Sequence, residues 1–135
     1  MTRRIAVVTG GRADYGLLQW VMHEIRAAPD FDLQLIVTGA HLEPRFGMTV
    51  EQIEADGFAI DARVPLGLES DAPADVARAM ARCLTGVSEV VDRLQPDLML
   101  AYLLWIGIVG YGLNTLLSVA RRRLFGRAGT VEAAA

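Results

Sequence analysis

A glycine-rich turn with one arginine and one aspartate is the part of this chain best equipped for chemistry. Gly10 and Gly11 end a β-branched run, and Arg12, Asp14 and Gly16 follow at the expected start of a helix. Glycines let a ligand approach the backbone closely, and the N–H groups and dipole at a helix N-terminus favour an anion. Arg12 is suited to a bidentate contact with phosphate, and Asp14 to fixing the turn as an N-cap. The residue types therefore indicate a phosphate site, with an arginine on a solvated turn as the alternative.

This turn differs from two familiar nucleotide-binding loops. Gly11 and Gly16 have the separation found in a Walker A loop, but Leu17 and Leu18 stand where that loop carries Lys and Ser or Thr. The turn also lacks the G-x-G-x-x-G pattern of dinucleotide sites. These departures argue against a P-loop and against a nicotinamide cofactor.

A titratable side chain, His41, follows the end of a second predicted strand. That strand, Leu33–Thr38, ends in Thr-Gly, as the first strand does at Thr9-Gly10. Because parallel strands end at the same edge of a sheet, we expect Arg12 and His41 to face one crevice. A histidine in that position is well placed to contact substrate, and the alternative is a hydrogen-bonded structural histidine.

Strands and helices alternate along the first hundred residues. Short apolar runs predict the strands, and apolar residues at helical spacing predict the helices between them. The expected strands are Ile5–Thr9, Leu33–Thr38, Phe58–Val64 at an edge and one beginning at Leu98; the expected helices follow Asp14 and Thr49 and span Ala74–Leu94. Thr49 and Gln52 have capping-box spacing, and Gly57 suits a helix C-terminus. The alternation predicts a doubly wound α/β half-domain with a parallel sheet.

Charge and cysteine content exclude several function classes. The net charge is −3, and no basic stripe with interleaved aromatic residues suggests nucleic-acid binding. Cys83 is the only cysteine, and its apolar helical setting predicts a buried thiol rather than a nucleophile. No spacing of His, Cys and acidic residues predicts a zinc site, so we expect no metal. Glu51, Glu54 and Asp56 are expected on a solvated helix face.

The pattern changes after Pro96. Leu98–Ala120 contains no charged residue and has about the length of a bilayer-spanning helix, roughly 20 residues. Arg121–Arg123 follow it, a flank typical of the cytoplasmic side. In that orientation the first hundred residues would lie outside the cell, and no signal peptide directs such an export. A junction near Leu100 between two unrelated segments is the preferred interpretation, and packing of the apolar segment on the open sheet is the alternative.

Several motifs in the first hundred residues resemble those of one enzyme family. Arg12-Ala13-Asp14-Tyr15-Gly16 is followed in order by the runs Leu35–Leu42, Phe46–Thr49 and Ile53–Asp61. Together they resemble the N-terminal part of the hydrolysing UDP-N-acetylglucosamine 2-epimerases, up to about Leu100. The resemblance implies a truncated Rossmann-like half of a two-domain, glycosyltransferase-B-like fold with the nucleotide between its domains. It also implies a UDP half-site made of Gly10, Gly11, Arg12, Asp14, Gly16 and His41.

The same resemblance implies a reaction, and parts that this sequence lacks. The family eliminates UDP from UDP-N-acetylglucosamine and hydrates the glycal to N-acetylmannosamine, a step toward sialic acid that uses no metal or redox cofactor. Ala101-Tyr102-Leu103 stands where the family carries the active-site Gly-Asp-Arg, and the second domain is missing from the sequence. We therefore expect an epimerase fragment with no catalytic residues of its own, weak binding of UDP or a UDP-sugar, and a cytoplasmic location.

The C-terminal segment carries a second resemblance. Leu104–Gly107, Gly110–Asn114 and Arg121–Phe125 resemble the last membrane helix of transporter permeases of the nitrate, sulfonate or taurine import kind. This implies, as an alternative function, a membrane-anchored or permease-derived chimera without enzyme activity. The expected organisation is a nucleotide-sugar-binding half-domain over residues 1–97, a hydrophobic, membrane-inserting helix over 98–120 and a basic, then small-residue tail over 121–135.

Overall fold

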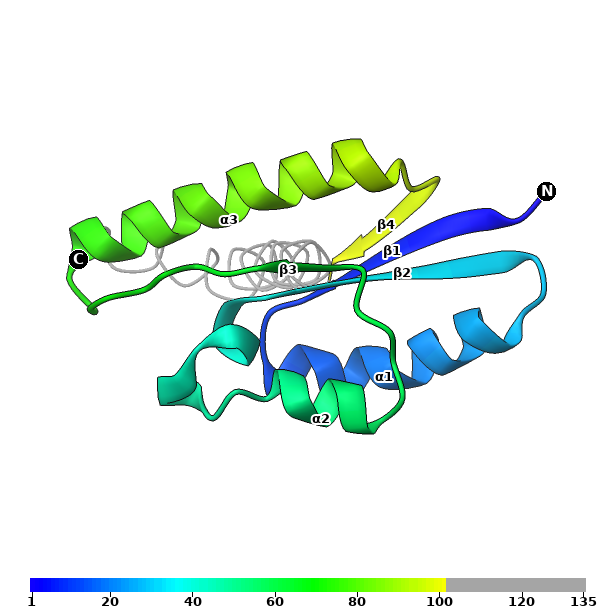
Figure 1. The fold of residues 1–135 in the computed structure, drawn as a ribbon, viewed down its shortest axis with the longest axis horizontal. Coiled ribbons are helices and arrows are strands. Elements are labelled where there is room, and N and C mark those ends of the chain that lie inside the picture. Colours follow the sequence, from blue (N-terminus) through cyan, green and yellow to red (C-terminus); the bar gives the residue numbers. More distant parts are fainter. Residues whose placement is uncertain (102–135) are drawn as a thin grey trace, which may run out of the picture. The chain divides into compact units, whose positions relative to one another are not determined.

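The structure, a computed structural model, describes residues 1–101, which form a parallel sheet with helices on both faces (Figure 1). The strands lie in the order β3-β2-β1-β4, so the chain crosses back over the sheet between β3 and β4. The elements, in chain order, are β1 Arg3–Thr9, α1 Arg12–Ala27, β2 Phe31–Thr38, α2 Val50–Ala55, β3 Ala62–Val64, α3 Pro73–Leu94 and β4 Leu98–Ala101, with short 3-10 turns at Gly39–Leu42 and Pro44–Phe46. The predicted α/β architecture is confirmed for this part of the chain.

The central strand β1 pairs in parallel with a strand on each side. Ile5 is opposite Leu33 of β2 and opposite Leu98 of β4, and Thr9 is opposite Val37. The carboxyl ends of β1 and β2 therefore lie side by side at the same end of the sheet. In such folds, ligands usually bind outside the carboxyl ends of the strands.

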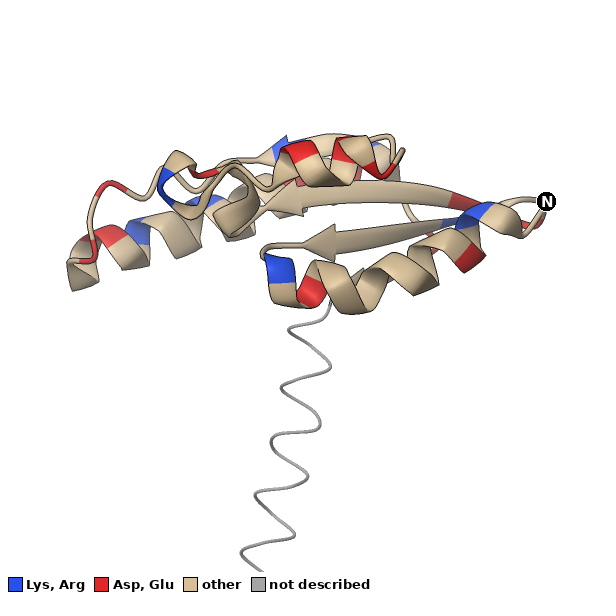
Figure 2. Cartoon of the chain, turned by 90° about the horizontal axis from the view of Figure 1, so that it is seen from below, with Lys and Arg blue, Asp and Glu red and all other residues tan. Residues whose placement is uncertain are grey.

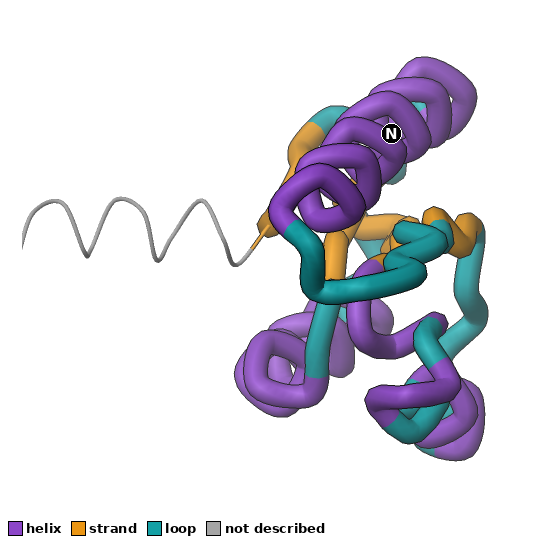
Figure 3. Tube along the Cα trace, turned by 90° about the vertical axis from the view of Figure 1, so that its left-hand side faces the viewer, coloured by secondary structure: helices purple, strands orange, loops and turns teal. Residues whose placement is uncertain are grey.

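Two apolar cores flank the sheet, because strands covered on both faces bury alternate side chains in opposite directions. Figure 3 shows α3 on one side of the strands and α1 and α2 on the other. The core beneath α1 and α2 includes Val7, Met22 and Leu35, all fully buried. The core beneath α3 includes Ile36 and Val90. The middle parts of β1 and β2 carry no charged residues (Figure 2), as expected for strands covered on both faces.

Two local predictions need correction. The strand expected over Phe58–Val64 is shorter, at Ala62–Val64, because Phe58 turns inward and packs in the core with 4 % of its surface exposed. The capping box expected for Thr49 and Gln52 does not form, since the Thr49 hydroxyl makes no cap hydrogen bond. Gly57 was predicted to follow the end of a helix, and its φ of +79° directly after α2 and Asp56 confirms this.

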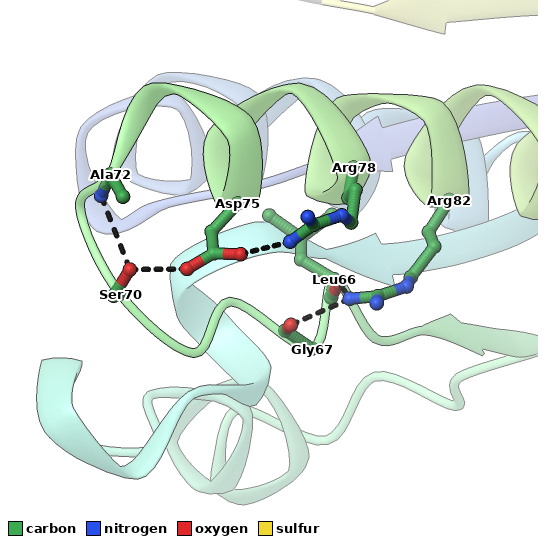
Figure 4. Close-up of polar contacts among 7 residues, drawn as sticks. All are labelled: Leu66, Gly67, Ser70, Ala72, Asp75, Arg78 and Arg82. Atoms are coloured by element: carbon green, nitrogen blue, oxygen red, sulfur yellow. Dashed lines mark hydrogen bonds and ion pairs between the residues drawn. The ribbon is translucent and has the colours of Figure 1, made fainter.

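The connection from β3 to α3 is held by polar contacts at the start of that helix (Figure 4). Ser70 and Asp75 are hydrogen bonded, Arg78 pairs with Asp75, and the Ala72 N–H donates to the Ser70 hydroxyl at 3.2 Å. Arg82 donates to the Leu66 and Gly67 carbonyls at 3.1 and 2.7 Å. These bonds attach the loop to α3 and give it a defined path along the edge of the sheet.

Helix α3 contacts the sheet through a narrow face. A β-carbon on Gly86 would lie 2.5 Å from Val64 Cγ1, so glycine allows the close approach of α3 to β3. Cys83, expected to be buried, is only half-buried and lies 3.7 Å from the Thr38 hydroxyl. Met80 and Leu84, which belong to the predicted apolar face, are 63 % and 74 % exposed, because the four described strands reach only part of that face.

The apolar C-terminal segment begins within the sheet. Leu98–Ala101 is strand β4, so the first four residues of the helix expected over 98–120 pair with β1 instead. The remainder of that segment, the 121–135 tail and the permease resemblance lie outside the described residues. Among residues 1–101, no helix combines the length and apolar character needed to cross a membrane.

Candidate functional site

The glycine turn after β1 is organised by Asp14. Helix α1 begins at Arg12 with Gly11 as its N-cap, so Asp14 is the third helical residue and not the expected N-cap. Its carboxylate accepts the N–H of Gly10 at 2.7 Å and that of Gly11 at 2.8 Å. The glycine N–H groups are therefore occupied, and the donors left at this helix end are the first three helical N–H groups, those of Arg12, Ala13 and Asp14.

The two glycines of the turn are not required by the fold itself. Gly11 has an extended backbone that any residue adopts. A β-carbon on Gly10 would lie 3.7 Å from Thr38, and one on Gly11 would lie 3.6 Å from Asp14, both ordinary contacts. Gly16, inside α1, has nothing within 4 Å of such a carbon. Since the fold would accept a side chain at these positions, glycine there is consistent with a surface that a ligand approaches closely.

The turns after β1 and β2 contact each other directly. The Ala40 N–H donates to the Gly10 carbonyl at 2.8 Å. Gly39 has a φ of +62°, and a β-carbon there would lie 2.4 Å from the Gly10 oxygen. The repeated Thr-Gly sequence thus marks two turns that pack against each other and place Arg12 and His41 in one region.

His41 is fully buried and hydrogen bonded at both ring nitrogens. Nε2 lies 3.0 Å from the Thr9 hydroxyl, and Nδ1 lies 2.7 Å from the Thr49 hydroxyl. Burial lowers the pKa of His41 below its usual 6.5, against smaller opposite effects of the Asp14 carboxylate and the Gly11 backbone. The ring is therefore neutral at pH 7, and its contacts match the structural alternative stated for it above.

Two cavities adjoin Arg12. The first, of about 280 Å³, is polar and is lined by Arg12, Tyr15, Gln19, His41, Thr49, Gln52 and Asp56. The second, of about 340 Å³, shares three of these residues and adds an apolar side; it is lined by Arg12, Phe46, Gly47, Met48, Thr49, Glu51, Gln52 and Ala55. The predicted crevice shared by Arg12 and His41 is thus present as the first cavity.

Asp56 forms a polar link between α1 and α2 in the first cavity. Its Oδ2 accepts the Tyr15 hydroxyl at 2.6 Å and the Gln19 amide at 3.2 Å, and its Oδ1 accepts the Gln52 amide at 2.9 Å. Burial, followed by the hydrogen bond and charge of Asp56, raises the pKa of Tyr15 above its usual 10. Of the three acidic residues expected on a solvated face, Glu51 and Glu54 are exposed but Asp56 is not.

Sequence reasoning missed Tyr15, Gln19, Gln52 and Asp56 as cavity residues. The available signal was their spacing, because Tyr15 and Gln19, and likewise Gln52 and Asp56, lie four residues apart on a helix or at its end. Arg12 is exposed and forms no salt bridge within residues 1–101. In the same residues, no group of three or more His, Cys, Asp or Glu side chains is placed to hold a metal ion.

Comparison with known proteins places this fold in a family. The family model described as UDP-N-acetylglucosamine 2-epimerase matches residues 23–102, more than half of the chain. The chain belongs to the UDP-N-acetylglucosamine 2-epimerase family. This confirms the resemblance drawn from the motifs of the first hundred residues, and the matched region ends next to β4, where that resemblance also stops.

Curated relatives match about three quarters of the chain. A UDP-N,N'-diacetylbacillosamine 2-epimerase (hydrolyzing) from Legionella pneumophila is 40 % identical over 100 residues, which cover 74 % of this chain and 26 % of the relative. A GDP/UDP-N,N'-diacetylbacillosamine 2-epimerase (hydrolyzing) from Campylobacter jejuni is 36 % identical over 97 residues, covering 72 % and 25 %. The chain therefore spans about a quarter of the length of these relatives.

A solved structure supports the fold independently. UDP-GlcNAc 2-epimerase from Neisseria meningitidis, crystallised with UDP-GlcNAc, matches with a TM-score of 0.56 over 73 % of this chain and 25 % of that one. The sequence identity is 15 %, so this likeness shows the fold alone.

Proposed function

We propose that this chain supplies the N-terminal phosphate-binding part of a hydrolysing 2-epimerase site for a UDP-linked N-acetylated amino sugar. The observation that carries the proposal is the position of Arg12, an exposed cation at the first residue of α1 that adjoins both cavities. The proposed half-site consists of Gly10, Gly11, Arg12, Asp14, Gly16 and His41.

The diphosphate would bind to the guanidinium of Arg12 and to the first N–H groups of α1, where the helix dipole favours negative charge. Gly10, Gly11 and Gly16 leave room for close approach, and Asp14 holds the turn through the glycine N–H groups. His41 has a positioning part, because it connects the end of β1 to the start of α2 through Thr9 and Thr49. No cofactor is part of this proposal.

We propose binding without turnover for the chain by itself. Elimination of UDP needs a base near the sugar, an acid and cations that stabilise the departing diphosphate. His41 is buried and engaged at both nitrogens, and Ala101 begins the segment that replaces the Gly-Asp-Arg of the family. The full chain incubated with UDP-N-acetylglucosamine should release no N-acetylmannosamine, and measurable release would contradict this part of the proposal.

The binding test is an NMR titration of the full ¹⁵N-labelled chain with UDP. Arg12→Ala should weaken binding by about 10-fold or more, since a hydrogen bond to a charged group contributes about 1.5–3 kcal/mol. Arg3→Ala is the matched control, because Arg3 begins β1 at the opposite end from Arg12 and is also exposed. Equal UDP affinity of the two variants, or no binding by the unaltered chain, would refute the half-site.

A membrane-associated function is the second candidate, and it rests on a different observation. Leu98–Ala120 has no charged residue, and Arg121–Arg123 follow it. Under this proposal the chain is a permease-derived or anchored chimera, whereas the half-site proposal favours a cytoplasmic location. Extraction of membranes with carbonate separates them: retention in the membrane fraction supports the second candidate, and complete release supports the first.

A further inference from the structure

Strand β4 lies at the edge of the described sheet but has the composition of an interior strand. Within residues 1–101 it pairs only with β1, so one side of its backbone faces outward. Its four residues, Leu98, Met99, Leu100 and Ala101, are all apolar. Parallel strands of this composition are normally flanked and covered on all sides, whereas free edges usually carry charges that oppose further pairing. The composition of β4 therefore indicates a strand with a second neighbour.

The opposite edge of the sheet shows the contrast. Strand β3 carries Arg63 between Ala62 and Val64, and the Arg63 guanidinium pairs with the Glu54 carboxylate. A charged residue of this kind protects a free edge against pairing with another strand. Because β4 has no such residue, the two edges of the described sheet are not equivalent.

Both faces of β4 are incompletely covered. Leu98 is opposite Ile5 and points to the face of α1, and Met99 is opposite Ala6 and points to the face of α3. Leu98 is 53 % exposed and Met99 is 44 % exposed. A single added helix would bury only one of these side chains, whereas a strand with a helix on each face would bury both.

Helix α1 has an apolar flank on the same side as β4. Tyr15 and Gln19 donate hydrogen bonds to Asp56 beside α2, which marks the flank of α1 that faces α2. Leu17 and Val21, both exposed, lie four residues apart on the opposite flank. Because α2 connects β2 to β3, this second flank faces the β4 side of the sheet.

Helix α3 has a similar flank on the other face of the sheet. Arg82 donates to the Leu66 and Gly67 carbonyls, which follow β3, so this side chain marks the flank of α3 nearest to that edge. The exposed Met80 and Leu84 lie on the opposite flank, again four residues apart. This flank is directed away from β3 and thus toward the β4 side.

We propose that β4, together with these flanks of α1 and α3, binds a second polypeptide that continues the parallel sheet, namely the part of an epimerase that this chain does not cover. The surface belongs to residues that match the family, and the match ends at residue 102, directly after β4. The chain covers 26 % of the Legionella pneumophila relative, so about three quarters of such a polypeptide lies outside the matched part. The inference does not depend on the phosphate half-site.

The test is co-expression of the full chain, carrying an affinity tag, with the untagged part of the Legionella pneumophila relative that this chain does not cover. We expect an equimolar complex after affinity purification and gel filtration. In the free chain, the β4 N–H groups that do not bond to β1 should exchange rapidly with solvent. In the complex the same N–H groups should exchange more slowly, because they then donate to the added strand.

Substitutions on the two faces of β4 locate the interaction. Leu98→Lys and Met99→Lys should each weaken the complex by about 10-fold or more, because each places a charge where the added polypeptide would bury it. Phe31→Lys is the matched control and should leave the complex unchanged. Phe31 is also a partly exposed apolar residue of the sheet, but it begins β2, which β1 separates from β4.

Several outcomes would contradict the inference. Absence of a complex would overturn it, and so would equal weakening by all three substitutions. Slow exchange of the outward β4 N–H groups in the free chain would overturn it as well. In a monomer, that result would mean that the chain covers this edge itself, and in a dimer it would mean that a second copy does.

Discussion

Gly39 lies so close to Gly10 that a β-carbon on Gly39 would be 2.4 Å from the Gly10 carbonyl oxygen. The contact joins the turns after β1 and β2, and the Ala40 N–H to Gly10 hydrogen bond accompanies it. The placement of the Arg12 region beside His41 therefore depends on the absence of a side chain at position 39.

Gly39→Ala should destabilise the fold more than a substitution that changes only backbone preference. The positive φ of Gly39 costs a non-glycine residue roughly 1–2 kcal/mol, and the clash with Gly10 adds to that cost. Gly47→Ala is the control, since Gly47 also has a positive φ but a β-carbon added to it would have nothing within 4 Å. Urea unfolding of both variants measures the difference, and equal loss in the two would show that the turns move apart without cost.

Gly16→Ala should stabilise the free chain. Gly16 lies inside α1, has open space around it, and glycine within a helix costs roughly 0.5–1 kcal/mol relative to alanine. We expect the free energy of unfolding, measured with urea, to rise by about that amount. UDP binding should weaken, because the added methyl group narrows the approach to the turn. A stabilised variant with unchanged UDP affinity would remove Gly16 from the proposed half-site.

The stability of the fold should fall as the pH drops below that at which His41 ionises in the unfolded chain, about 6.5. The pKa of His41 is lower in the folded protein, so below pH 6.5 the unfolded chain binds more protons and is favoured; above that pH the contribution of His41 is fully present. Urea unfolding between pH 5 and 8 tests this, with His41→Gln as the comparison that removes the titrating group. If the free energy of unfolding changed equally with pH in the two chains over pH 5–6.5, His41 would not be the group responsible for the pH dependence.

Tyr15→Phe should loosen the link between α1 and α2. It removes the hydroxyl that donates to Asp56 at 2.6 Å, and a hydrogen bond to a charged group contributes about 1.5–3 kcal/mol. A double-mutant cycle with Asp56→Asn, read by urea unfolding, isolates the coupling between the two side chains. Additive losses in the cycle would mean that Tyr15 and Asp56 do not stabilise each other.

Much of the fold can be predicted from local sequence patterns. Ile5–Thr9 is a short apolar run, and Leu33–Thr38 is apolar apart from Gln34 and the terminal threonine; such runs are typical of strands covered on both faces. Gly57 marks the end of α2, where a left-handed residue is needed. The motifs of the first hundred residues, among them the one around Phe46, resembled the family whose model matches residues 23–102. These features depend on one residue type or on a short period, so the sequence alone determines them.

Side-chain partners that come from distant segments were decided only by the tertiary structure. Thr49 has capping-box spacing, yet its hydroxyl bonds to His41, because a buried imidazole must satisfy both nitrogens. Asp56 was expected in solvent, but it accepts hydrogen bonds from Tyr15 and Gln19 of α1. In each case a local hydrogen bond competes with one that forms only when distant strands and helices pack together. The sequence pattern does not indicate which of the two bonds is stronger.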